Sequence, residues 1–121
     1  LALAATLLWA GTAATATATA AESPTLREAF RDHFPVGTAI NRNIAMGTSG
    51  RRSQDLVNSD QALTRTQFNQ ITAENDMKWQ LIHPREGQEG YDFGPADAFV
   101  AFGLSNRMEI VGHTLVWHSQ T

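Results

Sequence analysis

Short apolar runs alternate with segments of helical periodicity along most of the chain. The apolar runs predict three strands, at residues 36–40, 68–73 and 109–117. The remaining patterned segments predict helices from Ser23 up to Pro35, from Ser59 or Asp60 to about Gln67, and from Pro95 to about Asn106. After the first helix the order is strand, helix, strand, helix, strand, which indicates parallel βα units.

Local signals set the expected bounds of the first helix and of the loop that follows the first strand. Ser23 can cap the helix, Pro24 is favourable at its first position, and Pro35 ends it. Residues 41–53 are rich in Gly, Asn, Ser and Arg and have no apolar period. We therefore expect a loop between the first strand and the second helix.

Polar side chains gather where the second and third predicted strands end. In a (β/α)₈ barrel this face carries the active site. A doubly wound sheet would also have parallel strands, but it usually carries a Gly-rich phosphate-binding turn after its first strand, and residues 37–39 do not form one. We therefore expect an α/β fold, namely an incomplete (β/α)₈ TIM barrel with only the first three βα units. A complete barrel takes about 250 residues, and this chain has 121.

Residues 1–21 differ in composition from the rest of the chain. An apolar run from Leu1 to Trp9 leads into small residues, mainly alternating Ala and Thr. This pattern is typical of a secretory signal peptide, here truncated at its N-terminus, with cleavage after Ala20 or Ala21. A membrane anchor is the alternative, but the apolar run is far shorter than the roughly 20 residues that span a bilayer. We expect residues 22–121 to belong to a secreted, extracellular protein with no membrane association after cleavage.

Composition and charge narrow the classes of partner and site. The formal net charge is −3 and the isoelectric point is about 5.7, whereas nucleic-acid-binding domains normally carry a basic patch. We therefore expect no nucleic-acid partner. The chain has no cysteine, which excludes disulfides and thiolate metal sites within it.

The segment from Glu74 to Trp79 concentrates side chains that suit sugar binding. It places a carboxylate, an amide, an ammonium and an indole within six residues, and it contains Lys78, the only lysine of the chain. Sugar hydroxyls need donors and acceptors, and the apolar ring face packs well on an aromatic surface. In the alternative interpretation, Met77 and Trp79 are core residues, and Glu74 and Lys78 form an i,i+4 ion pair on the surface.

A second cluster runs from Gly112 to Gln120. His113, Trp117 and Gln120 could offer a hydrogen-bond donor, a stacking surface and an amide to one ligand. His113 and His118 do not match common zinc spacings, and no Glu lies between them, so we expect no metal site. The alternative is that both histidines are buried, hydrogen-bonded residues that support the end of a strand.

Taken together, these segments resemble glycoside hydrolase family 10, the endo-β-1,4-xylanases. The resemblance covers residues 34–120: 36–39 are similar to the family's first strand, 68–79 to its second with the Glu-Asn-x-Met-Lys-Trp core, 84–97 to the following connection, and 112–120 to its third strand. The chain departs from the usual pattern at Ala73, where Pro is common, and at Asp76, where Glu or Ala is common.

The resemblance implies roles for individual residues. The implied substrate-binding residues are Glu74, Asn75 and Lys78 in the glycone subsites, and His113, Trp117 and Gln120 beside the cleavage point. The implied supporting residues are Trp79 and His118. The family's acid/base Glu and nucleophile Glu lie on later strands, beyond Thr121, so no catalytic residue is expected in this chain and Glu74 is assigned to binding.

The activity implied by the resemblance is retaining hydrolysis of the xylan backbone. Such enzymes use two carboxyl groups about 5–5.5 Å apart, so the isolated chain is expected to be inactive. The expected partners are xylan and xylo-oligosaccharides, with no cofactor or metal, and the full-length protein is expected to be a monomer. The rival hypotheses are a non-catalytic carbohydrate-binding protein, which would lack the two downstream Glu residues, and a related barrel cellulase.

Overall fold

The computed structural model describes residues 22–119. Along the chain lie α1 (Leu26–Ala29), β1 (Gly37–Ile40), α2 (Arg42–Met46), α3 (Gln54–Gln67), β2 (Gln70–Ala73), α4 (Trp79–Ile82), the 3₁₀ turn η1 (Gln88–Gly90), α5 (Gly94–Ser105) and β3 (Glu109–Val111). The predicted signal peptide and Gln120 lie outside the described residues. None of the helices within residues 22–119 is long and apolar enough to cross a membrane.

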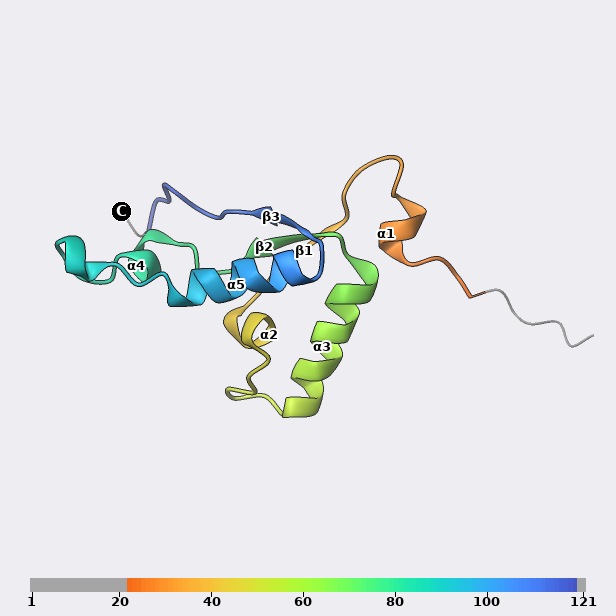
Figure 1. Ribbon diagram of the computed structural model, residues 1–121, viewed down its shortest axis with the longest axis horizontal. Coiled ribbons are helices and arrows are strands. Elements are labelled where there is room, and N and C mark those ends of the chain that lie inside the picture. Colours follow the sequence, from red (N-terminus) through yellow and green to blue (C-terminus); the bar gives the residue numbers. More distant parts are fainter. Residues whose placement is uncertain (1–21, 120–121) are drawn as a thin grey trace, which may run out of the picture.

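The three strands form one parallel sheet in the order β1-β2-β3. The β1–β2 register runs from Gly37 opposite Gln70 to Ile40 opposite Ala73, and on the other side of β2, Gln70 lies opposite Glu109. Parallel neighbours need a crossover connection. Helices α2 and α3 make the first crossover, and the α4–α5 segment makes the second. Figure 1 shows α2, α3 and α5 on the same side of the sheet.

The hydrophobic core lies between the sheet and the helices on this side. Its buried members are Ile40, Ile71, Ala73, Phe99, Phe102 and Met108. Along β2, Ile71 and Ala73 are buried while their neighbours are only half-buried, which is the alternation expected of a strand with one covered face. A Cβ atom on Gly103 of α5 would lie 2.7 Å from Ile110 Cγ1, so the close approach of this helix to β3 requires glycine.

The predicted helix around Ser59 begins earlier than expected. Helix α3 starts at Gln54, because Ser53 caps it by accepting a hydrogen bond from the Leu56 backbone N–H at 3.4 Å. Ser59 and Asp60 therefore lie inside the helix rather than at its N-terminus. The prediction was wrong because polar residues that can cap a helix occur both at Ser53 and at Ser59–Asp60. The earlier start places Val57 in the interior.

The predicted loop 41–53 contains the short helix α2. Asn41 caps it by accepting a hydrogen bond from the Ile44 N–H at 3.2 Å, and Gly47 ends it with a left-handed φ of 67°. Ile44 and Ala45 pack against the core. Five residues are too few to display an apolar period, so the sequence pattern did not reveal this helix.

The first helix is shorter than predicted and begins after Thr25 rather than Ser23. The Thr25 backbone N–H and hydroxyl both donate to Glu28 Oε2, at 2.9 and 2.8 Å. The backbone bond, then the hydroxyl bond, lower the pKa of the Glu28 carboxyl, and Arg31 and Arg27 act in the same direction. These local bonds fix the start of α1 at Leu26.

The second and third strands are also shorter than predicted. Phe68 caps the end of α3, and the Asn69 side chain accepts a hydrogen bond from the Val36 N–H at 2.7 Å, so β2 begins only at Gln70. Strand β3 ends at Val111, opposite Thr72. Because β2 extends only one residue beyond Thr72, to Ala73, residues 113–117 have no β2 residue beside them, despite their apolar pattern.

Candidate functional site

The two sequence clusters lie at the same edge of the sheet. Residues 74–79 follow β2 and residues 112–119 follow β3, and parallel strands place their carboxyl ends side by side. The Glu74 N–H donates to the Ile40 carbonyl at 3.0 Å, which keeps the start of the first cluster against the end of β1. The expected meeting of polar groups at the carboxyl ends of the strands is therefore present in the structure.

Lys78 forms the centre of this edge. Its ammonium donates to Asn75 Oδ1 at 2.9 Å and lies over the Trp117 ring, 4.0 Å from the ring centroid. The Lys78 N–H also donates to the Asn75 carbonyl at 2.8 Å, which closes the turn between the two residues. Lys78 thus contacts two other predicted binding residues, and we call Asn75, Lys78 and Trp117 the Lys78 cluster.

Within the Lys78 cluster the ammonium-bearing residue is buried, whereas Asn75 is exposed and Trp117 half-buried. Lys78 is only 9% exposed. A cation on an aromatic face gains more when water is excluded, and a charge-assisted hydrogen bond is stronger than a neutral one. An amide and an indole gathered around one ammonium can together with it donate to hydroxyl groups, accept from them, and cover an apolar ring face.

The alternative interpretation, with Met77 and Trp79 in the core and a Glu74–Lys78 ion pair on the surface, is wrong except for Met77. Residues 74–78 are not helical, and buried Lys78 bonds to Asn75 rather than to Glu74. Met77 packs partly against the core, but Trp79 is 45% exposed. Glu74 is exposed at the same edge of the sheet.

His113 lies in different surroundings from the Lys78 cluster. It lines a mostly apolar cavity of about 530 Å³ together with Met77, Phe93, Val100 and Leu115. The peptide bond that joins His113 to Thr114 is cis. His113 is exposed rather than a buried support of the strand end.

The two residues predicted to support the site make ring contacts. His118 lies edge-on to Trp117, with ring centroids 5.1 Å apart. The ring centroid of Trp79 lies 5.2 Å from that of His83 and 6.2 Å from that of Tyr91. Trp79 therefore belongs to an aromatic group that the sequence analysis did not identify. Trp79 begins α4 and His83 is its C-cap, so their i,i+4 spacing was the sequence feature that could have indicated this aromatic contact.

An ion pair beside the Lys78 cluster was also missed. Arg42 donates to Asp76 Oδ1 from Nη2 at 2.7 Å and from Nε at 3.1 Å. The Asp76 side chain is only 9% exposed, whereas that of Arg42 is 46% exposed. The partners are 34 residues apart in the sequence, and no local pattern pairs them.

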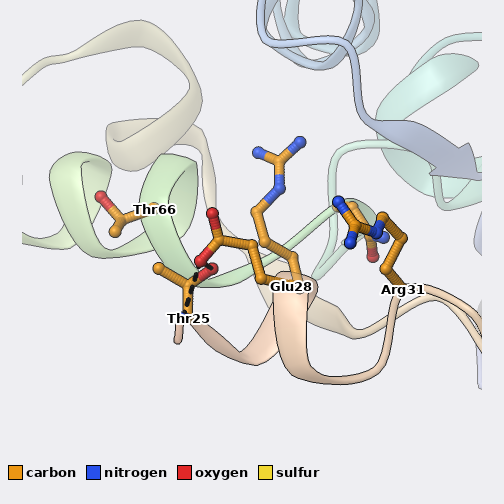
Figure 2. A pocket seen from close by; sticks show the side chains of 6 residues that line it. Thr25, Glu28, Arg31 and Thr66 are labelled. Carbon is orange, nitrogen blue, oxygen red and sulfur yellow. Dashed lines mark hydrogen bonds between the residues drawn. The ribbon is translucent and has the colours of Figure 1, made fainter. Parts of the chain in front are cut away.

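A second hollow lies at the opposite end of the strands. It has a volume of about 510 Å³ and is lined by Thr25, Arg27, Glu28, Arg31, Thr66 and Asn69. Figure 2 shows the hydrogen bond between Thr25 and Glu28 within it. Thr66 and Asn69 precede β2, so this hollow lies at the amino end of the sheet and contains none of the predicted site residues. Across residues 22–119, no group of three His, Asp or Glu side chains is arranged to hold a metal ion.

The sheet and its polar carboxyl edge define the chain as a piece of a parallel α/β domain with its candidate site at the strand ends. The model of glycosyl hydrolase family 10 matches residues 25–121. The chain belongs to this family, and the predicted family is confirmed.

Individual relatives of this chain support the same family and the same fold. A beta-1,4-xylanase of Dictyoglomus thermophilum is 41% identical over 100 residues, which are 83% of this chain and 24% of that protein. A thermostable celloxylanase of Thermoclostridium stercorarium is 39% identical over 84% of this chain and 23% of its own length. Xylanase 10B from Thermotoga petrophila RKU-1, crystallised with xylobiose, matches with a TM-score of 0.68 and 34% identity over 84% of this chain and 29% of its own.

These matches confirm the predicted fold class. The structural relatives are (β/α)₈-barrel xylanases, and the described residues form a parallel α/β piece that covers part of such a barrel. The chain spans about a quarter of the length of the relatives given above.

Proposed function

We propose that the full-length protein carrying this chain is an endo-β-1,4-xylanase that hydrolyses the xylan backbone with retention at the anomeric carbon. The observation that carries the proposal is the Lys78 cluster, in which Lys78 contacts both Asn75 and Trp117 at the carboxyl edge of the sheet. Membership in glycosyl hydrolase family 10, together with relatives described as xylanases, supports this substrate class.

The role proposed for this part of the protein is substrate binding. Lys78 and Asn75 would hydrogen-bond the hydroxyls of a xylose unit, and Trp117 would form the adjacent wall. Glu74, His113 and Gln120 are proposed to complete the sugar contacts, with Trp79 and His118 as supports. Because hydroxyls of a sugar both donate and accept, an ammonium paired with an amide can satisfy neighbouring hydroxyls at once.

The chemical step is proposed to use groups outside this chain. In retaining hydrolysis one carboxylic acid protonates the leaving oxygen while a carboxylate attacks the anomeric carbon, and water then releases the sugar from the covalent intermediate. We assign both carboxyl groups to Glu residues of later barrel strands. The chain by itself would therefore not hydrolyse xylan.

The test is an activity assay on a full-length family 10 polypeptide that carries residues 25–121. We expect it to release short oligosaccharides from xylan, and the first-formed anomer to retain the β configuration when followed by NMR. Binding of xylo-oligosaccharides without hydrolysis would instead favour the non-catalytic carbohydrate-binding protein. Release of the inverted anomer would contradict the retaining mechanism.

A second candidate substrate class is β-1,4-glucan. One relative is described as a celloxylanase and another, from Acetivibrio thermocellus, as an exoglucanase. Xylose differs from glucose in lacking the hydroxymethyl group, so steric fit in the glycone subsites decides between the two. Comparing kcat/KM on xylo- and cello-oligosaccharides of equal length separates these candidates.

We also propose that residues 1–21 act as a secretory signal peptide and that the protein is extracellular. The composition of this segment supports the proposal, since an apolar run precedes a stretch of small residues. N-terminal sequencing of the exported protein should begin near Ala21 or Glu22. A start at or before Trp9 would contradict it.

A further inference from the structure

We infer that Arg42 and Asp76 are positioning residues for the Lys78 cluster, an inference that rests on the proposed sugar-binding function. Asp76 lies between Asn75 and Lys78 in the sequence, and its side chain is nearly buried. Its carboxylate accepts two hydrogen bonds from Arg42, at 2.7 and 3.1 Å. The ion pair therefore joins the turn that carries two of the binding side chains to a different part of the fold.

Arg42 is itself held firmly in place. It is the first residue of α2, whose start is fixed by the Asn41 cap. Ile44 and Ala45 of the same helix pack against the core, and the Gln61 side chain donates to the Ile44 carbonyl at 2.6 Å. An arginine on so well anchored a helix can fix the position of its partner.

The turn has two anchors, and both come from the same corner of the fold. The Glu74 N–H donates to the Ile40 carbonyl at the end of β1, and Asp76 accepts from Arg42 just two residues later in the chain. Between these anchors Asn75 bonds to Lys78 within the turn. Beyond them Lys78 lies over the Trp117 ring, and its carbonyl accepts from the Leu81 and Ile82 N–H groups of α4. Loss of Arg42 would remove both of the hydrogen bonds that tie the Asp76 carboxylate to α2.

The expected consequence is a loss of sugar affinity rather than only a loss of stability. A shift of the turn would separate the Lys78 ammonium and the Asn75 amide from the hydroxyls that they bind. Small misplacements of positioning groups can cost up to about 100-fold in function. A merely structural ion pair would lower the melting temperature but leave the affinity of the folded protein unchanged.

The experiment uses a full-length family 10 polypeptide that carries residues 25–121 and measures two quantities for each variant. These are the Kd for xylotriose by calorimetry, well below the melting temperature, and the melting temperature itself. We expect Arg42→Ala and Asp76→Ala each to raise the Kd on the order of 10-fold. Arg42→Lys should recover most of the affinity, because one ammonium can still contact the single acceptor oxygen, Asp76 Oδ1.

The double variant Arg42→Ala/Asp76→Ala separates positioning from stability. Arg42→Ala alone leaves a buried carboxylate without its cation, which is costly, whereas the double variant removes the charge as well. We expect the melting temperature of the double variant to exceed that of Arg42→Ala, while its Kd stays raised. This variant and Arg42→Lys keep the test decisive if a single alanine variant fails to fold.

The matched control is Arg52→Ala. Arg52 also forms an ion pair, with Asp60 of α3, but the pair is exposed and distant from the Lys78 cluster in the fold. Its Kd should equal that of the wild type. Equal Kd values for wild type, Arg42→Ala and Asp76→Ala would overturn the inference and leave the proposed function standing. A wild-type polypeptide that neither binds nor hydrolyses xylo-oligosaccharides would overturn the proposed function, and the inference with it.

Discussion

At the scale of the residue, the proposed binding residues differ in burial. Lys78 and Glu74 both follow β2, yet Lys78 is nearly buried against Asn75 and Trp117 while Glu74 is exposed. A buried ammonium requires compensating partners, and here an amide oxygen and an indole face supply them. This arrangement keeps the cation in a fixed position at the edge where the sugar is proposed to bind.

Asn75→Ala in the full-length protein should weaken sugar binding without unfolding it. The change removes both the amide proposed to contact a sugar hydroxyl and the acceptor that holds Lys78 Nζ. We expect a loss of about 0.5–3 kcal/mol in binding free energy, measured as the Kd for xylotriose, and a lower melting temperature without loss of the fold, because the buried Lys78 ammonium loses an acceptor.

Asn58→Ala provides the control for Asn75→Ala. The Asn58 side chain accepts one hydrogen bond, from Gln54 Nε2 at 3.0 Å, on the exposed side of α3 and away from the strand ends. Its Kd should match the wild type. If Asn75→Ala behaves in the same way as Asn58→Ala, Asn75 does not take part in sugar binding.

At the scale of the element, caps and close contacts determine where each helix begins and how it packs. The start of α3 depends on the Ser53 side chain, and the packing of α5 on β3 depends on the absence of a side chain at Gly103. Both features lie away from the candidate site, so substitutions there test the fold alone.

Ser53→Ala should destabilise the protein, whereas Ser59→Ala should not. Loss of an N-cap side chain costs about 0.5–2 kcal/mol. Ser59 is an exposed residue inside α3, where alanine is the better helix former. Chemical denaturation of both variants gives the two free energies of unfolding, and equal values would contradict the assignment of Ser53 as the cap.

Gly103→Ala should also destabilise the protein, by about 1–3 kcal/mol. The added Cβ would lie within 3.0 Å of the Ile110 and Ile71 side chains, so α5 or the strands would have to move. Gly112→Ala is the matched control, because a Cβ there meets only Met77 Sδ, at an ordinary 3.8 Å. The difference between the free energies of unfolding of the two variants measures the cost of placing a methyl group between α5 and the strands. No difference would show that the core accommodates this group.

At the scale of the whole molecule, three strands make an open sheet with two edges. Among the described residues β1 and β3 each have one strand neighbour, and apolar side chains beyond β3 are strongly exposed, with Leu115 at 91%. In a barrel every strand finds partners on both sides because the sheet closes on itself. The relatives, of which the matched residues cover about a quarter, are barrels of that kind.

Residues 22–121 expressed alone should therefore fold poorly and lack xylanase activity. Open sheet edges and exposed apolar surface promote aggregation, and the proposed catalytic Glu residues are not part of this segment. Size-exclusion chromatography and a thermal melt should show aggregates without a cooperative transition. A soluble, cooperatively unfolding monomer would contradict the folding expectation, and measurable hydrolysis would contradict the assignment of Glu74 to binding alone.

Local sequence patterns were sufficient to predict the features that depend only on residues close together in the chain. The alternation of strands and helices, the helix that begins near Pro95, and the polar groups after β2 all follow from side-chain periodicity and helix-start signals. The binding residues were chosen through the family motifs, and the structure brings Asn75, Lys78 and Trp117 together at one edge. The elements and the two clusters could be predicted because each depends on a continuous stretch of chain.

The sequence by itself determined the family and the order of the three strands and of helices α1, α3 and α5, while the tertiary structure decided where elements stop and which distant side chains meet. Strand β3 ends at Val111 although the apolar pattern continues to residue 117, and β2 extends only one residue further, to Ala73, so it offers no partner to residues 113–117. Arg42 and Asp76 pair across 34 residues because α2 and the turn after β2 pack at one corner. Such contacts depend on how chain segments pack in space, which side-chain periodicity does not specify.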